Sequence, residues 1–206
     1  MVDVRLLSIT PDYMSVLQTA CSKPYGKEVT SDGVKKIITS GHLSILEHGC
    51  ATFEVRCSVR VLGQLTRHRH LSFTVKSARG STFDTVIIPE GMYDFAEKHG
   101  LAREKLKNWQ TAHPMLEAYK RVIADGLEAE DAAYFLPQGA ETELVVTGNF
   151  RAWYEYLPKR LCKRAMPEHR EIARRIQFLL MQEAPEVFDT CLLNCGSCTF
   201  SHRGVV

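Results

Sequence analysis

Residues 67–80 read RHRHLSFTVKSARG and place four cationic side chains among hydroxyls and imidazoles. Arginine offers a rigid fork of donors that can bind two phosphate oxygens at once, and serine hydroxyls and backbone amides can bind the remaining oxygens. The stretch therefore favours binding of phosphate groups and can serve two phosphorylated ligands. A solvated basic loop or a nucleic-acid-binding patch has a similar composition, so charge alone leaves these alternatives open.

The spacing of residues in this stretch is more specific than its charge. It resembles the signature of flavin-dependent thymidylate synthases, R-H-R-x-x-S-x-N-x-x-S-x-R-Y, and matches at Arg67, His68, Arg69, Ser72, Ser77 and Arg79. Residues 41–48, GHLSILEH, resemble the family's G-H-x-S-x-x-E-H motif. A later block is matched by Leu136-Pro137, Glu141-Thr142, Thr147, Asn149, Arg151, Arg160, Arg164-Ala165, Glu168 and Arg170. The resemblance spans residues 40–188.

The resemblance implies a flavin site built from several parts of the chain. It assigns contacts with FAD to His42, Ser44, Glu47, Arg67, His68, Arg69, His70, Asn149, Arg151 and Glu155. This set suits the cofactor, because the FAD pyrophosphate needs paired cations and the isoalloxazine ring needs donors near N1, O2 and N5.

The same resemblance implies a nucleotide site. It assigns the nucleotide phosphate to Gln64, Arg67, Ser77, Ala78 and Arg79. Arg160 would lie beside the pyrimidine and favour negative charge on the uracil oxygens, so it is the residue expected to carry catalysis. Ser77 is the second catalytic candidate, as a nucleophile at C6. The sequence fixes no general base beside it, and we therefore assign Ser77 to phosphate binding.

The implied reaction is methylation of C5 of a uracil nucleotide, dUMP to dTMP. Methylenetetrahydrofolate would donate the carbon, and FAD reduced by NADPH would donate the hydride. The expected partners are a pyrimidine nucleotide monophosphate, folate and further copies of the chain, because the family shares its active sites among the subunits of a homotetramer. No nucleic acid or membrane partner is expected.

Several positions depart from the family pattern near the nucleotide. Ala133 stands where the family usually has arginine, three residues before the Leu-Pro pair. Thr74 replaces the signature asparagine, Val75 replaces an acidic or polar residue, and Gly80 replaces the final tyrosine. The alternatives are therefore a methylase or hydroxymethylase acting on UMP or another pyrimidine nucleotide, with Lys76 or Lys163 in compensation, or a flavin- and nucleotide-binding homologue without catalysis.

Composition supports a soluble protein. The chain has 206 residues, 45% of them apolar, and a formal net charge of +2. This length fits one domain over residues 1–190, and the balanced charge does not favour coating of a polyanion. Residues 1–10 lack a basic region followed by a long apolar stretch, and no segment has the apolar length of a membrane helix, so we expect a cytoplasmic protein.

The pattern of apolar residues predicts an α+β fold, with a small mixed or antiparallel sheet flanked by helices. Alternation predicts strands over residues 2–9, 51–57 and 142–147. Helical periodicity predicts helices over residues 11–20, 32–39, 59–66, 149–164 and 167–183, and a helical region over 89–126. Trp153, Tyr154 and Tyr156 fall on an amphipathic helix and are expected to pack in the core or an interface.

The C-terminal tail, residues 191–206, contains Cys191, Cys195, Cys198 and His202. A Cys3His zinc site would fit this spacing, but the second ligand pair typical of structural zinc is absent. The three-cysteine spacing also occurs in iron-sulfur enzymes, which need a large barrel after the motif. We therefore predict reduced thiols and no metal.

Overall fold

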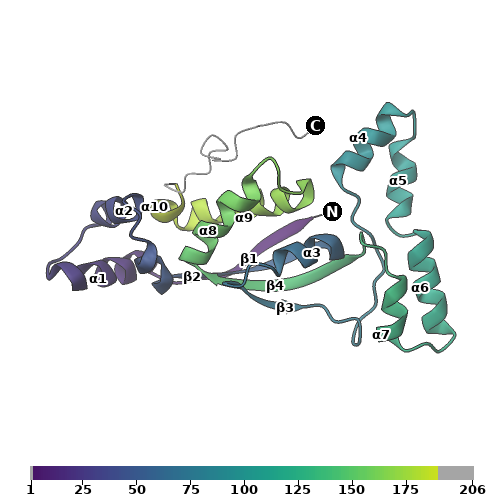
Figure 1. Cartoon of the computed structure of the whole chain (residues 1–206), viewed down its shortest axis with the longest axis horizontal. Coiled ribbons are helices and arrows are strands. Elements are labelled where there is room, and N and C mark those ends of the chain that lie inside the picture. Colours follow the sequence, from purple (N-terminus) through teal and green to yellow (C-terminus); the bar gives the residue numbers. More distant parts are fainter. Residues whose placement is uncertain (1, 190–206) are drawn as a thin grey trace.

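The computed structural model describes residues 2–189 and is built on a four-stranded antiparallel sheet (Figure 1). The strand order is β1-β2-β4-β3, with bounds β1 Asp3–Ile9, β2 Cys50–Ser58, β3 Ser72–Val75 and β4 Glu141–Asn149. The predicted α+β class is confirmed, and each strand pairing is antiparallel rather than mixed. The sequence pattern did not predict β3, which lies inside the basic stretch and pairs with β4.

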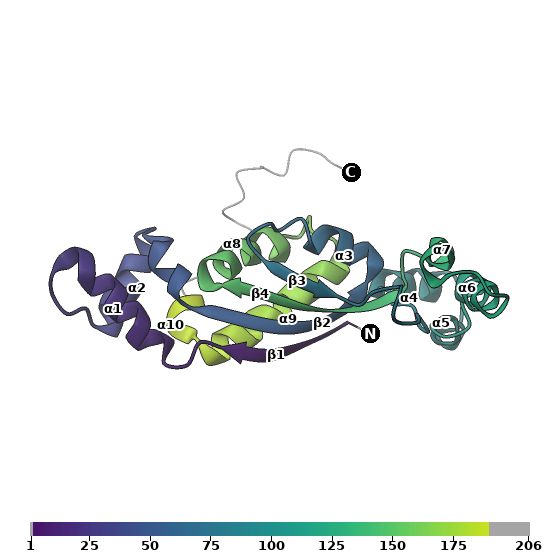
Figure 2. The ribbon, with the colours of Figure 1, turned by 90° about the horizontal axis from the view of Figure 1, so that it is seen from below.

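Alternation along β2 and β4 separates two faces of the sheet. Phe53, Val55 and Val146 are fully buried on one face, whereas Thr52 and Thr147 meet on the other, where their hydroxyls lie 2.9 Å apart. Ion pairs between neighbouring strands, Arg5–Glu54 and Arg56–Glu143, also lie on that polar face. The apolar face packs against α8 Phe150–Leu161 and α9 Pro167–Glu183, and Figure 2 shows α9 behind β1 and β2.

Three predicted helices form as α1 Tyr13–Tyr25, which runs beyond its predicted end, α2 Ser31–Thr39 and α3 Val59–Leu65. A 3₁₀ helix, η1 Leu43–His48, precedes β2, and a short α10 Pro185–Phe188 follows α9. Side chains of Thr30, Ser58 and Asn149 accept hydrogen bonds from the first-turn amides of α2, α3 and α8. Such caps satisfy amides that have no partner within the helix.

The helical region expected over residues 89–126 is divided into separate helices. These are α4 Glu90–Lys98, α5 Arg103–Trp109 and α6 Pro114–Ala124, followed by α7 Ala129–Ala132 and the 3₁₀ helix η2 Ala133–Phe135. Gly100, with φ of +67°, ends α4, and Pro114 begins α6. Figure 1 shows these helices as an arm at one end of the sheet.

Buried apolar side chains form two clusters. The larger one lies between the sheet, α8 and α9, and it contains Trp153 and Tyr156, which confirms their prediction as core residues. The smaller one belongs to the arm and is centred on Phe83, Leu116 and Tyr119. Within residues 2–189 no helix has the length and apolar character needed to cross a membrane. Cys191, Cys195, Cys198 and His202 lie outside the described residues.

Candidate active site

One group of predicted flavin residues gathers at the N-terminal end of α8. The Arg151 guanidinium lies 2.5 Å from the Glu47 carboxylate on η1 and 3.0 Å from the Glu155 carboxylate one turn along α8. These carboxylates raise the pKa of Arg151 through hydrogen bonds. Asn149 caps α8, because its side-chain oxygen accepts from the Ala152 amide at 2.8 Å. The structure therefore brings Glu47, Asn149, Arg151 and Glu155 together.

His42 and Ser44 lie at the start of η1, where His42 is the residue before the helix. Both side chains are exposed. Ser44 lines a cavity of about 630 Å³ that opens between α1 and η1. Within residues 2–189, no hydrogen bond or ion pair is found between His42 and the Glu47–Arg151 pair.

A second group lies at the C-terminal end of α8. Arg160 Nε donates to His68 Nε2 at 2.7 Å, and Arg160 Nη2 donates to the Gln64 backbone carbonyl at 3.3 Å. Arg160 and His68 are half-buried. The Gln64 side-chain amide contacts the Met166 sulfur at 3.6 Å. Three residues assigned to different ligands by the resemblance thus form a single cluster around one guanidinium.

Two buried residues that the sequence did not assign to the site, Tyr156 and His169, support this cluster. The Tyr156 hydroxyl lies 3.1 Å from His169 Nε2. The rings of Tyr156 and His68 meet edge to face, and their centroids are 4.9 Å apart. Burial, with Arg160 and Lys159 nearby, lowers the pKa of His68 to about 4. Burial, with Arg160 and His68 nearby, lowers the pKa of His169 to about 3. Helical periodicity could have marked His169 as buried, because it shares a face of α9 with Ile172, Ala173 and Ile176.

The third group is the loop after β3. The Arg79 guanidinium pairs with Glu130 on α7 at 2.7 Å, and both side chains are well exposed. Ser77 Oγ accepts from the Arg79 amide at 3.2 Å, and Ala78 packs against the arm cluster. Arg67, Arg69 and His70 are exposed on the turn between α3 and β3. The structure therefore does not bring this loop into contact with the Arg160 cluster within one chain.

The two ends of α8 are well separated. Arg151 and Arg160 are nine residues apart in one helix, which corresponds to about 13 Å along its axis. The predicted site residues therefore form three groups in a single chain rather than one pocket.

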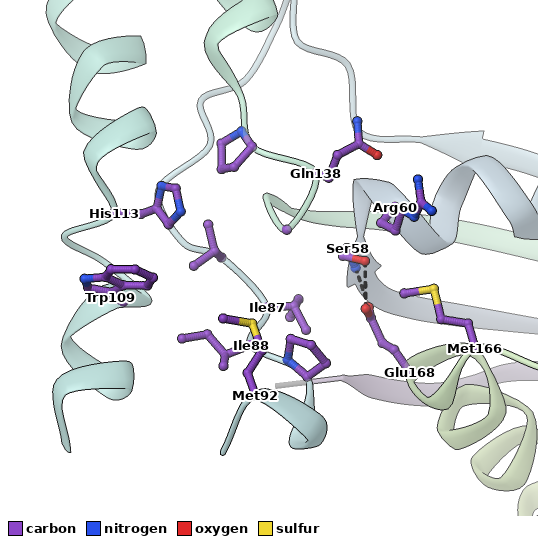
Figure 3. A pocket seen from close by; sticks show the side chains of 14 residues that line it. Ser58, Arg60, Ile87, Ile88, Met92, Trp109, His113, Gln138, Met166 and Glu168 are labelled. Carbon is purple, nitrogen blue, oxygen red and sulfur yellow. Dashed lines mark hydrogen bonds between the residues drawn. The ribbon is translucent and has the colours of Figure 1, made fainter. Parts of the chain in front are cut away.

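A separate apolar cavity of about 350 Å³ lies between the arm and the sheet (Figure 3). Ile87, Ile88, Met92 and Trp109 line it, and none of the sequence-predicted site residues does. Its wall includes Glu168, whose carboxylate accepts from both the backbone amide and the hydroxyl of Ser58, at 2.7 and 2.8 Å. This buried carboxylate joins α9 to Ser58, which ends β2 and caps α3.

Metal ligation finds no support in the part of the chain that the structure describes. Among residues 2–189, no three His, Cys, Asp or Glu side chains are grouped closely enough to hold a metal ion.

Comparison with known proteins gives one consistent result. Residues 5–186 match the family model described as thymidylate synthase complementing protein. The chain belongs to this family. A flavin-dependent thymidylate synthase from Pyrococcus abyssi is 33% identical over 193 residues, which cover 84% of this chain and 76% of the relative. One from Mycobacteroides abscessus is 33% identical over 180 residues, covering 81% and 72%.

A third relative, the flavin-dependent thymidylate synthase from Geobacter sulfurreducens, is 35% identical over 157 residues, covering 74% of this chain and 66% of the relative. These matches confirm the family recognised from the motifs and the prediction that the chain is an enzyme of this type. They extend across all three groups of site residues, from η1 to the start of α9.

Proposed function

We propose that the protein methylates C5 of a uracil nucleotide, with methylenetetrahydrofolate as carbon donor and NADPH-reduced FAD as hydride donor. Family membership supports the reaction class, and the Arg160 cluster is the observation in this structure that carries the assignment. A pyrimidine that gains negative charge on its oxygens during reaction at C5 needs a fixed cation beside it. Arg160 offers such a cation in a half-buried setting.

The contacts that hold the Arg160 guanidinium leave its positive charge available to a ligand. Its Nε and Nη2 donate to neutral acceptors, His68 and the Gln64 carbonyl. Among the described residues no partner is found for Nη1 and no carboxylate pairs with the group. Arg160 therefore keeps an uncompensated charge and at least one open donor, which would bind a uracil carbonyl oxygen.

The residues near η1 and the basic turn suit a flavin dinucleotide. Arg67 and Arg69 are exposed cations that would hold the pyrophosphate. Glu47, Arg151 and Glu155 form a polar group of donors and acceptors beside the capped start of α8, which would bind the ring and ribitol hydroxyls. When bound, FAD supplies the hydride. His42, Ser44, His68, His70 and Asn149 complete the proposed contacts.

Nucleotide phosphate binding is proposed for Gln64, Arg67, Ser77, Ala78 and Arg79. The Arg79–Glu130 ion pair is exposed, and a surface pair of this kind contributes little and exchanges readily for a phosphate. Because the loop and the Arg160 cluster are separate in one chain, a complete site would combine residues of different subunits. We therefore propose a homotetramer with shared active sites, in which Ser77 binds phosphate and Arg160 acts on the base.

Three departures from the family pattern favour a second candidate, a methylase of UMP or another pyrimidine nucleotide. Val75 packs against the main core and offers no polar group to a ligand, and Ala133 in η2 offers no charge. Thr74 is exposed on β3. A site that lacks these contacts would tolerate a different sugar from that of dUMP.

A spectroscopic experiment tests both candidates. The purified protein would be reduced anaerobically with NADPH and mixed with methylenetetrahydrofolate and either dUMP or UMP, while flavin reoxidation and methylated product are followed. Methylated dUMP would establish a thymidylate synthase, and product from UMP alone would establish a ribonucleotide methylase. Bound flavin without either product would contradict the proposal and indicate a binding protein.

A further inference from the structure

His68 and Arg160 form a contact whose chemistry constrains both residues. Arg160 Nε can only donate a hydrogen bond, so His68 Nε2, at 2.7 Å, must be the acceptor. An imidazole accepts at one nitrogen only when it is neutral and carries its proton on the other. His68 is therefore neutral with the proton on Nδ1, and it directs the guanidinium without cancelling its charge.

The surroundings of His68 favour this neutral state. Lys159 and Arg160 from α8 both oppose a positive charge on the ring. Tyr156 lies edge-on to it, with centroids 4.9 Å apart, and His169 from α9 faces it at 6.3 Å. Tyr156 is in turn held through its hydroxyl by the fully buried His169. Within residues 2–189, the groups found near the His68 ring are thus two cations, an aromatic ring and a neutral imidazole, and no carboxylate is found there.

We propose that His68 is a positioning residue, which holds the Arg160 guanidinium in the orientation required for the pyrimidine, with Tyr156 and His169 as its buried support. This inference rests on the proposed function, and it gives His68 a role toward the nucleotide in addition to its proposed contact with the flavin. Gln64 completes the arrangement, because its backbone carbonyl accepts from the adjacent Nη2.

A matched pair of variants tests the positioning role of His68. His68→Gln places an oxygen acceptor near the position of Nε2, whereas His68→Asn places it near the position of Nδ1, out of reach of Arg160. Flavin content would be measured by visible absorbance, and affinity for dUMP and UMP by calorimetry on the flavin-loaded protein. His99→Gln, at an exposed position ending α4, controls for purification and loading.

We expect the two His68 variants to differ in nucleotide affinity when both are saturated with flavin. His68→Gln should bind the nucleotide within about threefold of the parent, and His68→Asn should bind about 10- to 100-fold more weakly, as expected for loss of a hydrogen bond to a charged group. Equal affinities in the two variants would overturn the proposal.

A second measurement needs no nucleotide. Nitrogen-15 NMR of the histidine rings should show His68 protonated on Nδ1, and Arg160→Leu should raise the His68 pKa because the nearby cation is removed. No change in the titration would overturn the pairing. If the parent binds flavin but neither nucleotide, the proposed function fails, and this measurement still decides whether His68 positions Arg160.

Discussion

At the scale of single residues, the two arginines of α8 differ in what surrounds them. Arg151 is compensated by the carboxylates of Glu47 and Glu155, whereas Arg160 is held by a neutral imidazole and a carbonyl. A compensated guanidinium contributes structure and hydrogen-bond donors, and an uncompensated one contributes charge to a ligand. This contrast supports our proposal that the pyrimidine base of the nucleotide binds at the Arg160 end of the helix.

Single substitutions should separate the flavin and nucleotide functions. Arg160→Ala should retain flavin but lower nucleotide-dependent turnover by about 100-fold or more, because the cation beside the pyrimidine is lost. Arg69→Ala should lower the flavin content of the purified protein, because an exposed cation for the pyrophosphate is removed. Absorbance at flavin wavelengths and product formation provide the measurements. Full turnover in Arg160→Ala would refute its catalytic assignment.

Stability should fall when the solution is acidified from pH 6.5 to 4. His68 and His169 have folded-state pKa values of about 4 and about 3, below the value of 6.5 for free histidine. Between these values the unfolded chain binds more protons than the folded chain, so the free energy of unfolding decreases as pH falls. His169 alone should remove about 3 kcal/mol at pH 4.

Urea unfolding of the parent and of His169→Gln at a series of pH values tests this expectation. The variant should show a shallower dependence on pH over the same range, and exposed His99→Gln should follow the parent. A variant whose stability depends on pH as steeply as that of the parent would mean that His169 does not carry the effect.

At the scale of elements, close backbone packing joins η1 and β2 to α8. A Cβ added at Gly49 would lie 2.5 Å from a ring carbon of Phe150, which is fully buried and packed between Tyr13 and Phe188. The ring has no space into which it can move. This close approach, with the Phe150 amide donating to the Gly49 carbonyl at 2.8 Å, holds the end of η1 against the start of α8.

Two glycine substitutions test this packing. Gly49→Ala should destabilise the protein by about 1–3 kcal/mol through overpacking, and it should also weaken flavin binding. Gly63→Ala, within α3 and with no atom within 4 Å of the added Cβ, should stabilise by about 0.5–1 kcal/mol. Thermal and urea unfolding provide both values. Equal effects of the two substitutions would show that the Phe150 contact is not limiting.

At the scale of the whole molecule, the candidate site residues are dispersed over the sheet, α8 and the loop that faces the arm. Arg79 is paired with Glu130 on α7, whereas Arg160 lies against α3. Within residues 2–189 no hydrogen bond or ion pair joins the Arg79–Glu130 pair to the Arg160 cluster, and we propose that a nucleotide contacts both through a second copy of the chain. The dispersed arrangement is the structural reason for proposing shared sites.

Complementation between inactive variants tests this proposal. Arg79→Ala and Arg160→Ala should each be nearly inactive alone, and oligomers assembled from an equal mixture should regain activity at about a quarter of the sites, where both arginines are intact. Native mass spectrometry would verify mixed oligomers. Mixed oligomers without recovered activity would show that one chain supplies both arginines to a site.

Much of the fold was predictable because it follows from local periodicity. The alternation in β2 and β4 and the helical stripes of α8 and α9 required no knowledge of partners. β3 was missed because its four residues, Ser-Phe-Thr-Val, lie inside a stretch dominated by charges and hydroxyls, and its pairing with β4 comes from a distant segment. The arm was predicted as helical, but its breaks depend on Gly100 and on packing around Tyr119.

The sequence by itself determined the family, because the fixed spacing of Arg67, Ser77, Asn149 and Arg160 survives without any coordinates. It also determined the α+β class, which depends on residue order along the chain. Only the tertiary structure decided that His68 meets Arg160 and that His169 supports Tyr156. These contacts join residues 92 and 13 positions apart, and burial and hydrogen-bond direction exist only once the chain has folded.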